Sequence, residues 1–187
     1  MNEKCMEKML VEHCAPTLAG IKCANLFNYF YKSKLLAREE LTEINNLLNC
    51  KGVYLEVLMW RDDSVLIYLY RKAMLEKELK RQEVFELLKK YGYESCEMKS
   101  CIRHLKHRIR NSSCFPHEIG VFLGYPLEDV YGFIVNGGRN CKSCGMWKVY
   151  CNKEEKDRLF KKFQKCKDVY LQVFCDGRDL VRMTVGT

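Results

Sequence analysis

Two short segments of this chain each occur twice, in the same order. Residues 50–57 (CKGVYLEV) return as residues 166–173 (CKDVYLQV). Residues 14–21 (CAPTLAGI), which lie upstream, are echoed by residues 114–121 (CFPHEIGV). Self-similar segments in a fixed order are typical of a duplicated supersecondary unit. The chain is therefore expected to contain an internal duplication, with its halves related by a pseudo-twofold axis.

The length of the chain, 187 residues, is enough for one well-buried core. We therefore expect a single domain over residues 1–187, with repeat halves 1–71 and 112–187 joined by helices over 72–110. The second half carries extra residues, which the two sequence offsets place near 136–150. An insertion into a repeated scaffold is a natural place for function.

Runs that are rich in β-branched and aromatic side chains predict the strands. The runs 53–60 and 65–71 are separated by Arg-Asp-Asp-Ser, which is typical of a β-hairpin. A second hairpin is expected over 169–175 and 180–185, around the turn dipeptide Asp-Gly between them. The two hairpins would join into one antiparallel sheet packed with helices, which is an α+β fold.

Apolar residues at helical spacing, with proline or glycine near the ends, predict the helices. Pro16 is expected in the first turn of a helix that continues to about residue 31. Pro116 would open the equivalent helix, which Gly124-Tyr-Pro126 breaks into two short pieces. Further helices are expected over residues 37–49, 72–91, 95–110 and 153–165.

Composition argues against several classes of protein. The longest apolar runs are too short to span a bilayer and the N-terminus shows no apolar signal segment, so a soluble, cytoplasmic protein is expected. The twelve cysteines would then be free thiols, small core residues or metal ligands rather than disulfides. The net charge of +8 indicates either acidic partners and anionic ligands or a merely basic surface.

Cys141 and Cys144 form a Cys-x-x-Cys pair in a glycine-rich stretch. Two thiolates at this spacing are able to hold two positions of a tetrahedral zinc or iron site, with His117, Cys114 or Cys151 as further ligands. The same spacing also suits a redox-active thiol pair. Free thiols in a loop are the third interpretation, because the sequence offers no second ligand pair with comparable spacing.

His117 and Glu118 follow Pro116, so both are expected in the first turn of a helix. The positive end of a helix dipole lowers the pKa of an imidazole and attracts anions, which makes His117 a candidate acid–base or ligand residue. Glu118 is a second candidate catalytic residue, or it simply complements the dipole. Cys14, at the corresponding place in the first half, is a candidate nucleophile or an apolar helix-entry residue.

The helix expected over 95–110 carries a basic face. Its cationic and histidine side chains lie opposite its apolar stripe: Lys99, Arg103, Lys106, His107 and Arg110. Such a face attracts an acidic partner or is simply solvated. The chain has no helix-turn-helix, zinc-finger or RNA-recognition signature, which argues against nucleic acid as the partner.

Three segments carry a resemblance to a known family: residues 115–133 (FPHEIGVFLGYPLEDVYGF), 15–22 (APTLAGIK) and 144–150 (CGMWKVY). In these segments the chain resembles a domain-of-unknown-function family that is common in anaerobic Gram-positive bacteria. The resemblance brings no known activity, but it implies a redox or metal-handling context and an acidic redox partner such as a flavodoxin. The positions that it carries over include the candidate ligand-binding residues Pro16, Thr17, Lys22, Tyr125, Asp129, Trp147 and Tyr150.

The sequence supports three functional hypotheses. The first is a cytoplasmic accessory protein that binds an anionic ligand or an acidic partner, using residues 115–150 and the two proline-led helix starts. The second is a redox or group-transfer enzyme with His117 as the acid–base residue and Cys14 or Cys144 as the thiol. The third is a metal-handling protein that uses Cys141, Cys144 and His117. The sequence identifies no cofactor.

Overall fold

The computed structural model of the protein describes residues 6–112 and 114–186. Its helices and antiparallel sheets make an α+β fold, as the sequence predicts. The chain packs as two compact units, each of which is described by itself. Unit one comprises Met1–Ala73 with Phe163–Thr187, and unit two comprises Met74–Lys162.

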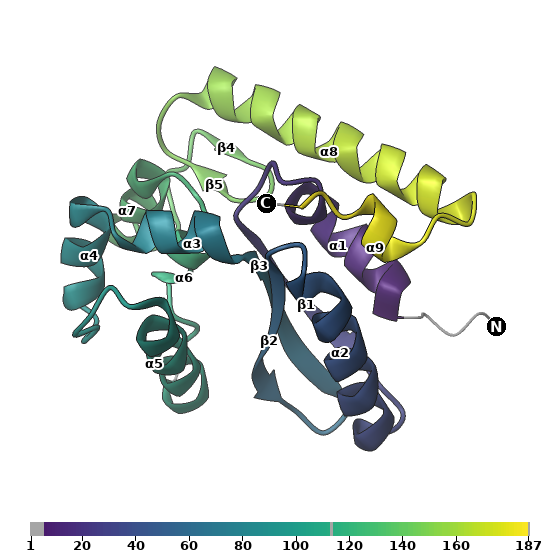
Figure 1. Cartoon of the computed structure of the whole chain (residues 1–187). Coiled ribbons are helices and arrows are strands. Elements are labelled where there is room, and N and C mark those ends of the chain that lie inside the picture. The colour runs from purple at the N-terminus through teal and green to yellow at the C-terminus, as the bar shows by residue number, and fades with distance from the viewer. Residues whose placement is uncertain (1–5, 113, 187) are drawn as a thin grey trace. The chain divides into compact units, whose positions relative to one another are not determined.

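Unit one is built on a three-stranded antiparallel sheet with the strand order β1-β3-β2 (Figure 1). β2 (Val53–Trp60) and β3 (Ser64–Arg71) form the first of the two predicted hairpins. β1 (Ala24–Phe30) pairs with the other side of β3. β3 is buried along its whole length, as expected for a central strand that is apolar on both faces.

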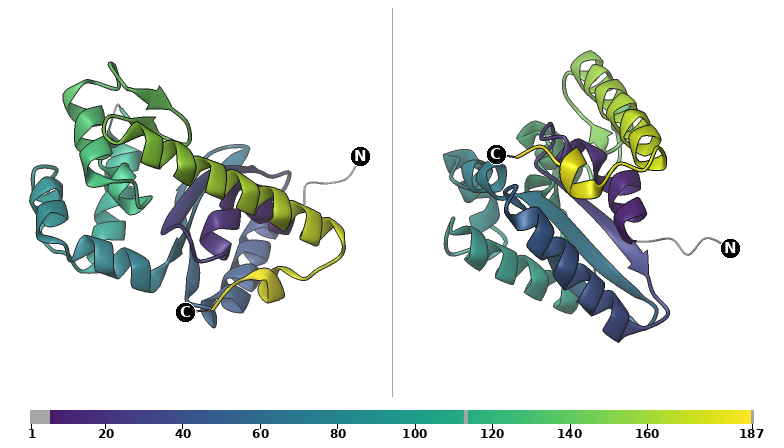
Figure 2. Two further views of the ribbon diagram at one scale, coloured as in Figure 1. Left: turned by 90° about the horizontal axis from the view of Figure 1, so that it is seen from above. Right: turned by 45° about the vertical axis from the view of Figure 1, so that its right-hand side comes forward.

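Two helices pack side by side over one face of this sheet (Figures 1 and 2). α1 (Met6–Leu18) lies over β1 and β3, and α2 (Lys34–Asn49) lies over β2. The register places Phe27, Ile67 and Val57 in one row across the three strands. Phe27 and Ile67 belong to the apolar core under the helices, and the partly buried Val57 packs against it. Burial of this face stabilises unit one by about 25 cal/mol for each Å² of apolar surface removed from water.

The end of α1 shows that the first predicted helix is wrong. Pro16 lies in the last turn of α1, and no helix runs from it to residue 31. Gly20 follows with a φ of +77°, a conformation that favours glycine and ends the helix. The buried guanidinium of Arg71 donates hydrogen bonds to the carbonyl oxygens of Thr17 (2.6 Å) and Leu18 (2.7 Å) at this helix end. The segment around Pro16 therefore has a structural role, because it closes α1.

The second predicted hairpin is also wrong, because that part of the chain is helical. α8 runs over Lys153–Cys175 and α9 over Leu180–Met183. The side chains of α8 that pack on the core of unit one lie three or four residues apart, as on one side of a helix: Tyr170, Leu171, Val173 and Phe174. This tertiary packing outweighs the β propensity of the segment. The expected Asp-Gly turn instead ends α8, where Gly177 has a φ of +86°.

The structure does not show the internal duplication. The first copy of the repeated CK-x-VYL segment forms the turn before β2 and part of that strand, whereas the second copy lies within α8. Pro16 is in the last turn of a helix, whereas Pro116 precedes the short helix α6 (Ile119–Phe122). The predicted halves 1–71 and 112–187 coincide with neither compact unit. A short shared sequence is insufficient to fix a secondary structure when its surroundings differ.

Unit two is mainly helical. The predicted helix 72–91 is two helices with a break at residues 80–81, whereas α5 and the break between α6 and α7 are as predicted. The elements are α3 (Lys72–Leu79, most of which is in this unit), α4 (Gln82–Lys89), α5 (Met98–Asn111), α6, α7 (Leu127–Val135), a small sheet of β4 (Ser143–Cys144) and β5 (Lys148–Val149), and the first part of α8. Within the described residues, no helix has both the length and the apolarity needed to cross a bilayer.

Candidate functional site

Unit two contains a cavity of about 350 Å³ that is lined mostly by apolar side chains. Its aromatic lining comes from Phe115, Tyr125, Phe133 and Trp147, and its polar lining comes from His117, Asp129, Cys144 and Lys148. A volume of this size is at the lower end of the range for small-molecule sites. Much of the predicted site is therefore gathered around one cavity.

Two pairs of rings form walls of this cavity. Tyr125, in the turn between α6 and α7, stacks on Trp147 with ring centroids 4.6 Å apart. The ring of His117 meets that of Phe133 edge-on, with centroids 5.0 Å apart. Phe160 packs edge-on against Trp147 at 4.5 Å. Because each ring rests on another, the walls are held in place before any ligand arrives.

Asp129 on α7 anchors the segment that carries Trp147. Its buried carboxylate accepts a hydrogen bond from Nε1–H of Trp147 at 2.8 Å, and two more from the backbone N–H groups of Tyr150 (2.7 Å) and Cys151 (3.1 Å). Hydrogen bonds to an ionised carboxylate are roughly twice as strong as those between neutral groups. Asp129 is therefore engaged in building the cavity wall, although the resemblance implied a role in ligand binding.

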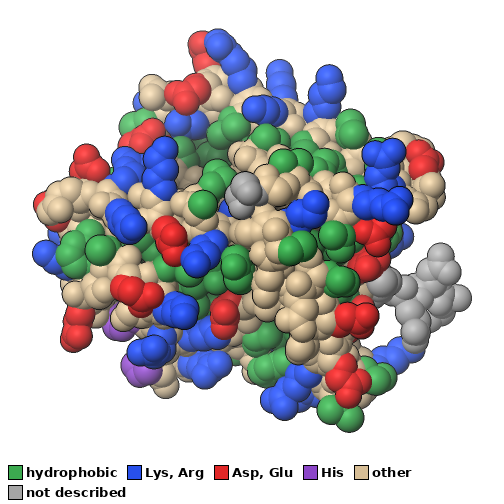
Figure 3. Space-filling model, in the orientation of Figure 1, with side chains coloured by type: hydrophobic (Ala, Val, Ile, Leu, Met, Phe, Trp, Pro, Cys, Tyr) green, Lys and Arg blue, Asp and Glu red, His purple; other side chains and the backbone are tan. Residues whose placement is uncertain are grey.

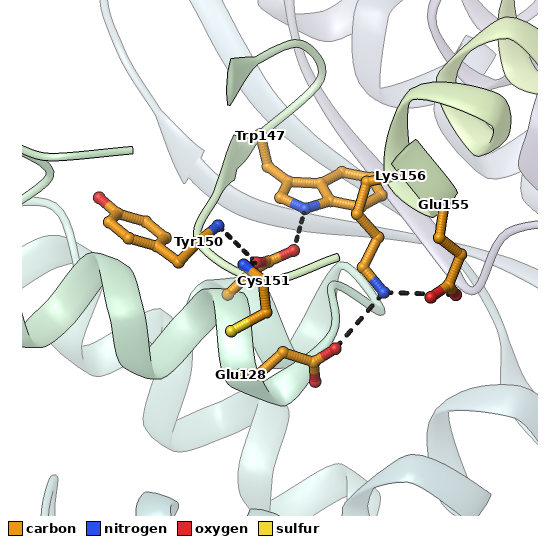
Figure 4. A network of polar contacts seen from close by, with 7 residues as sticks. Glu128, Trp147, Tyr150, Cys151, Glu155 and Lys156 are labelled. Carbon is orange, nitrogen blue, oxygen red and sulfur yellow. Dashed lines mark hydrogen bonds and ion pairs between the residues drawn. The ribbon is translucent and has the colours of Figure 1, made fainter. Parts of the chain in front are cut away.

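Lys156 makes a second connection between α7 and α8. Its ammonium group lies 3.4 Å from Oε1 of Glu128 and 3.5 Å from Oε1 of Glu155 (Figure 4). The lysine is buried although both carboxylates are partly or largely exposed. This pairing holds the first turn of α8 beside the start of α7, next to the Asp129 anchor.

Two glycines allow close approach of the segments that build the cavity. A Cβ atom on Gly132 of α7 would lie 2.3 Å from Cγ of Tyr150, and one on Gly145 would lie 2.4 Å from ring atoms of Phe160. Such distances are shorter than any ordinary carbon–carbon contact. Tyr150 therefore packs on α7 and does not line the cavity, although it was expected in the site.

Glu118 is not a partner of His117 in the cavity. Its carboxylate is buried, forms an ion pair with Arg108 of α5 and accepts a hydrogen bond from the hydroxyl of Tyr93 at 3.3 Å. Burial, and then the charge of Glu118, raise the pKa of the Tyr93 hydroxyl well above its usual value. Glu118 thus joins α5 to the start of α6, and the structure does not place it at the cavity.

The remaining candidate catalytic and ligand-binding residues lie in unit one: Cys14, Pro16, Thr17 and Lys22. Burial raises the pKa of the Cys14 thiol far above its ordinary value, which disfavours the thiolate that a nucleophile needs. Burial also lowers the pKa of Lys22 to about 8, and the ammonium of Lys22 donates a hydrogen bond to the carbonyl oxygen of Ala24. Thr17 donates to the side-chain oxygen of Asn25 at 2.7 Å.

The two cysteines of the Cys-x-x-Cys pair have different surroundings. Cys144 is exposed and lines the cavity, whereas Cys141 is half-buried and does not. Over residues 6–112 and 114–186, no three His, Cys, Asp or Glu side chains are grouped so that they could hold a metal ion. No cysteine among residues 6–112 and 114–186 is in a disulfide.

Phe133 and Lys148 are among the lining residues that the sequence did not single out. Phe133 lies one turn after Asp129 on α7. Residues four apart share one face of a helix, so this spacing within a family segment could have marked Phe133 as a neighbour of Asp129. Lys148 lies opposite Cys144 in the β4–β5 pair, and its ammonium donates a hydrogen bond to the carbonyl oxygen of Gly138 at 2.7 Å. Lys148 lies in the family segment 144–150, but its place at the cavity depends on the register of that short pair.

Comparison with known proteins gives a family but no activity. A family model described as "Protein of unknown function (DUF3793)" matches residues 10–184, which include the cavity and most of both units. No curated protein and no solved structure matches the chain. The resemblance of the three sequence segments to a domain-of-unknown-function family is confirmed, and the chain belongs to the DUF3793 family.

Proposed function

We propose that the protein is an accessory protein that binds a small, ring-bearing molecule in the cavity of unit two. The observation that supports this proposal is the set of side chains that line the cavity. The rings of Tyr125, Phe133 and Trp147 surround apolar space, while the carboxylate of Asp129 is engaged in holding the wall. Preformed apolar cavities with a few polar groups are the usual form of small-molecule sites.

A thiol–imidazole enzyme is the second candidate, because His117 and Cys144 line the same cavity. Such chemistry needs an imidazole that a third group orients. In the part of the chain that the structure describes, the His117 ring rests on Phe133, and Glu118 is engaged by Arg108. The surroundings of His117 therefore favour binding over catalysis.

Tryptophan fluorescence tests the binding proposal, because the two tryptophans lie in different units: Trp60 in unit one and Trp147 in unit two. A Trp60→Phe variant leaves Trp147 as the only reporter. The probe is 4-nitrobenzyl alcohol, a neutral one-ring compound that quenches tryptophan on contact. We expect saturable quenching with a midpoint below about 1 mM, because the probe enters the cavity beside Trp147.

The Trp147→Phe variant, with Trp60 as its reporter, is the matched control. Its quenching should rise linearly with probe concentration, as for simple collisions in solution. Far-UV circular dichroism checks that both variants are folded. Linear quenching of Trp147 in a folded Trp60→Phe protein would reject the cavity as a binding site.

An acidic partner is a separate proposal, which α5 supports. Lys99, Arg103 and Arg110 are exposed on one side of this helix, and α5 contains no acidic residue. Figure 3 shows Lys, Arg and His side chains together over α5, at the lower left. The redox or metal-handling context, with a flavodoxin as the acidic partner, is part of this proposal.

Salt dependence tests the partner proposal. In a titration with an acidic flavodoxin, we expect the affinity to fall at least about tenfold between low and physiological salt, since exposed charges are screened. Arg103→Gln should weaken binding, whereas Lys153→Gln, which removes an exposed cation on α8, should leave it unchanged. If no binding is seen, or if neither salt nor the Arg103→Gln substitution changes the affinity, the flavodoxin is rejected as the partner.

A further inference from the structure

We infer that the ligand of the unit-two cavity is an aromatic acid, with one or two fused rings and a carboxylate that is bound by Lys148. This inference rests on the proposed function and specifies the class of ligand. It combines the size of the cavity, the chemistry of its walls and the balance of charge among its lining residues.

The size of the cavity limits the ligand. A volume of about 350 Å³ equals the share of roughly a dozen water molecules in the liquid. One or two rings with a short acidic side chain fill such a space, whereas a dinucleotide does not. The aromatic side chains of Tyr125, Trp147 and Phe133 that line the cavity favour a planar ring system over a branched aliphatic one.

Among the residues that the structure describes, the lining has one cation, Lys148, and one carboxylate, Asp129, and the bonds that each already makes favour an anion as the ligand. Lys148 is half-buried, and a carbonyl oxygen, that of Gly138, accepts a hydrogen bond from its ammonium. An ammonium group has three N–H donors, so further donors remain for a ligand. No carboxylate among the described residues forms an ion pair with Lys148. Asp129, which also lines the cavity, already accepts hydrogen bonds from three N–H groups.

The ammonium of Lys148 is also held in position. Pairing of Lys148 with Cys144 fixes its backbone, and its Nζ lies 5.9 Å from the centroid of the Phe133 ring. A cation that is fixed beside an aromatic wall loses little freedom when an anion binds. A ring lying against Phe133 would therefore bring a short acidic side chain to Lys148.

A matched pair of ligands tests the inference by isothermal titration calorimetry on the whole chain. 1-Naphthaleneacetate and 1-naphthaleneacetamide have nearly the same shape, but only the first is charged. We expect the wild-type protein to bind the acetate about tenfold more tightly at low salt, because a hydrogen bond to an ionised group is the stronger one. Lys148→Met should reduce this ratio to about one and leave the affinity for the amide within about twofold.

Lys142→Met is the control, since Lys142 is an exposed cation of the same loop that does not line the cavity. Lys142→Met should keep the wild-type ratio of the affinities for the acetate and the amide. Lys148→Arg should keep it too, and this variant also shows whether position 148 tolerates a substitution. Equal binding of both ligands to the wild-type protein would overturn the inference and leave the proposed function standing. A ratio that survives in Lys148→Met would overturn the role of Lys148. Failure of both ligands to bind would overturn the inference, and the quenching of Trp147 by 4-nitrobenzyl alcohol would then decide the proposed function separately.

Discussion

Asp129→Ala is expected to lower the free energy of unfolding by about 3–5 kcal/mol. The variant leaves the N–H groups of Trp147, Tyr150 and Cys151 without their acceptor, and each unsatisfied buried donor costs about 1–3 kcal/mol. The cavity wall should loosen at the same time, because these hydrogen bonds hold the segment on α7. Urea denaturation measures the loss of stability, and quenching of Trp147 in the Trp60→Phe background reports the cavity.

Two variants control for this prediction. Glu154→Ala removes a largely exposed carboxylate of α8 that is 3.8 Å from Arg158, and it should change stability by no more than about 0.5 kcal/mol. Asp129→Asn keeps the shape but loses the charge, so it should fall between the wild type and Asp129→Ala. A cost for Asp129→Ala as small as that for Glu154→Ala would show that Asp129 does not anchor the wall.

Gly132→Ala is expected to destabilise the protein by about 2 kcal/mol, whereas helix propensity alone would predict that it stabilises α7. Alanine in a helix is favoured over glycine by about 1 kcal/mol. The added Cβ atom would, however, lie 2.3 Å from Cγ of Tyr150, and overpacking of a core costs about 1–3 kcal/mol or more. Contact with Tyr150 should therefore outweigh propensity, and thermal unfolding should show a lower midpoint.

Val135→Ala on the same helix is the comparison for Gly132→Ala. Val135 is 79% exposed, so its truncation should change stability by no more than about 0.5 kcal/mol in either direction. A Gly132→Ala protein that is more stable than the wild type would mean that Tyr150 does not pack against α7.

Local signals in the sequence were sufficient for the elements whose packing agrees with their propensity. The β2–β3 hairpin has β-branched and aromatic runs around a short polar turn, and α5 has a clean apolar stripe. The segment 169–175 has similar β-forming residues, but it is helical because its apolar side chains fit the core of unit one at helical spacing. That preference depends on residues far away in the chain, so no local pattern reveals it.

The sequence identified only part of the candidate site, because some of its contacts join residues that are far apart in the chain. The family segments pointed to Tyr125, Asp129 and Trp147, which the structure brings together at one cavity. They gave no means of telling residues that hold the cavity together, such as Asp129, from residues that are available to a ligand. The hydrogen bonds of Asp129 reach positions about twenty residues further along the chain, and the register that places Lys148 arises only when β4 and β5 pair.

The indole N–H signals in a ¹H–¹⁵N correlation spectrum give the most direct test of a ligand site in unit two. The chain has two tryptophans, and a Trp60→Phe sample assigns their signals. During a titration with 1-naphthaleneacetate, we expect the Trp147 signal to shift until it saturates, because its N–H lies in the cavity wall and bonds to Asp129. The Trp60 signal should stay in place. A Trp147 signal that does not move, or equal shifts of both signals, would contradict the proposed site.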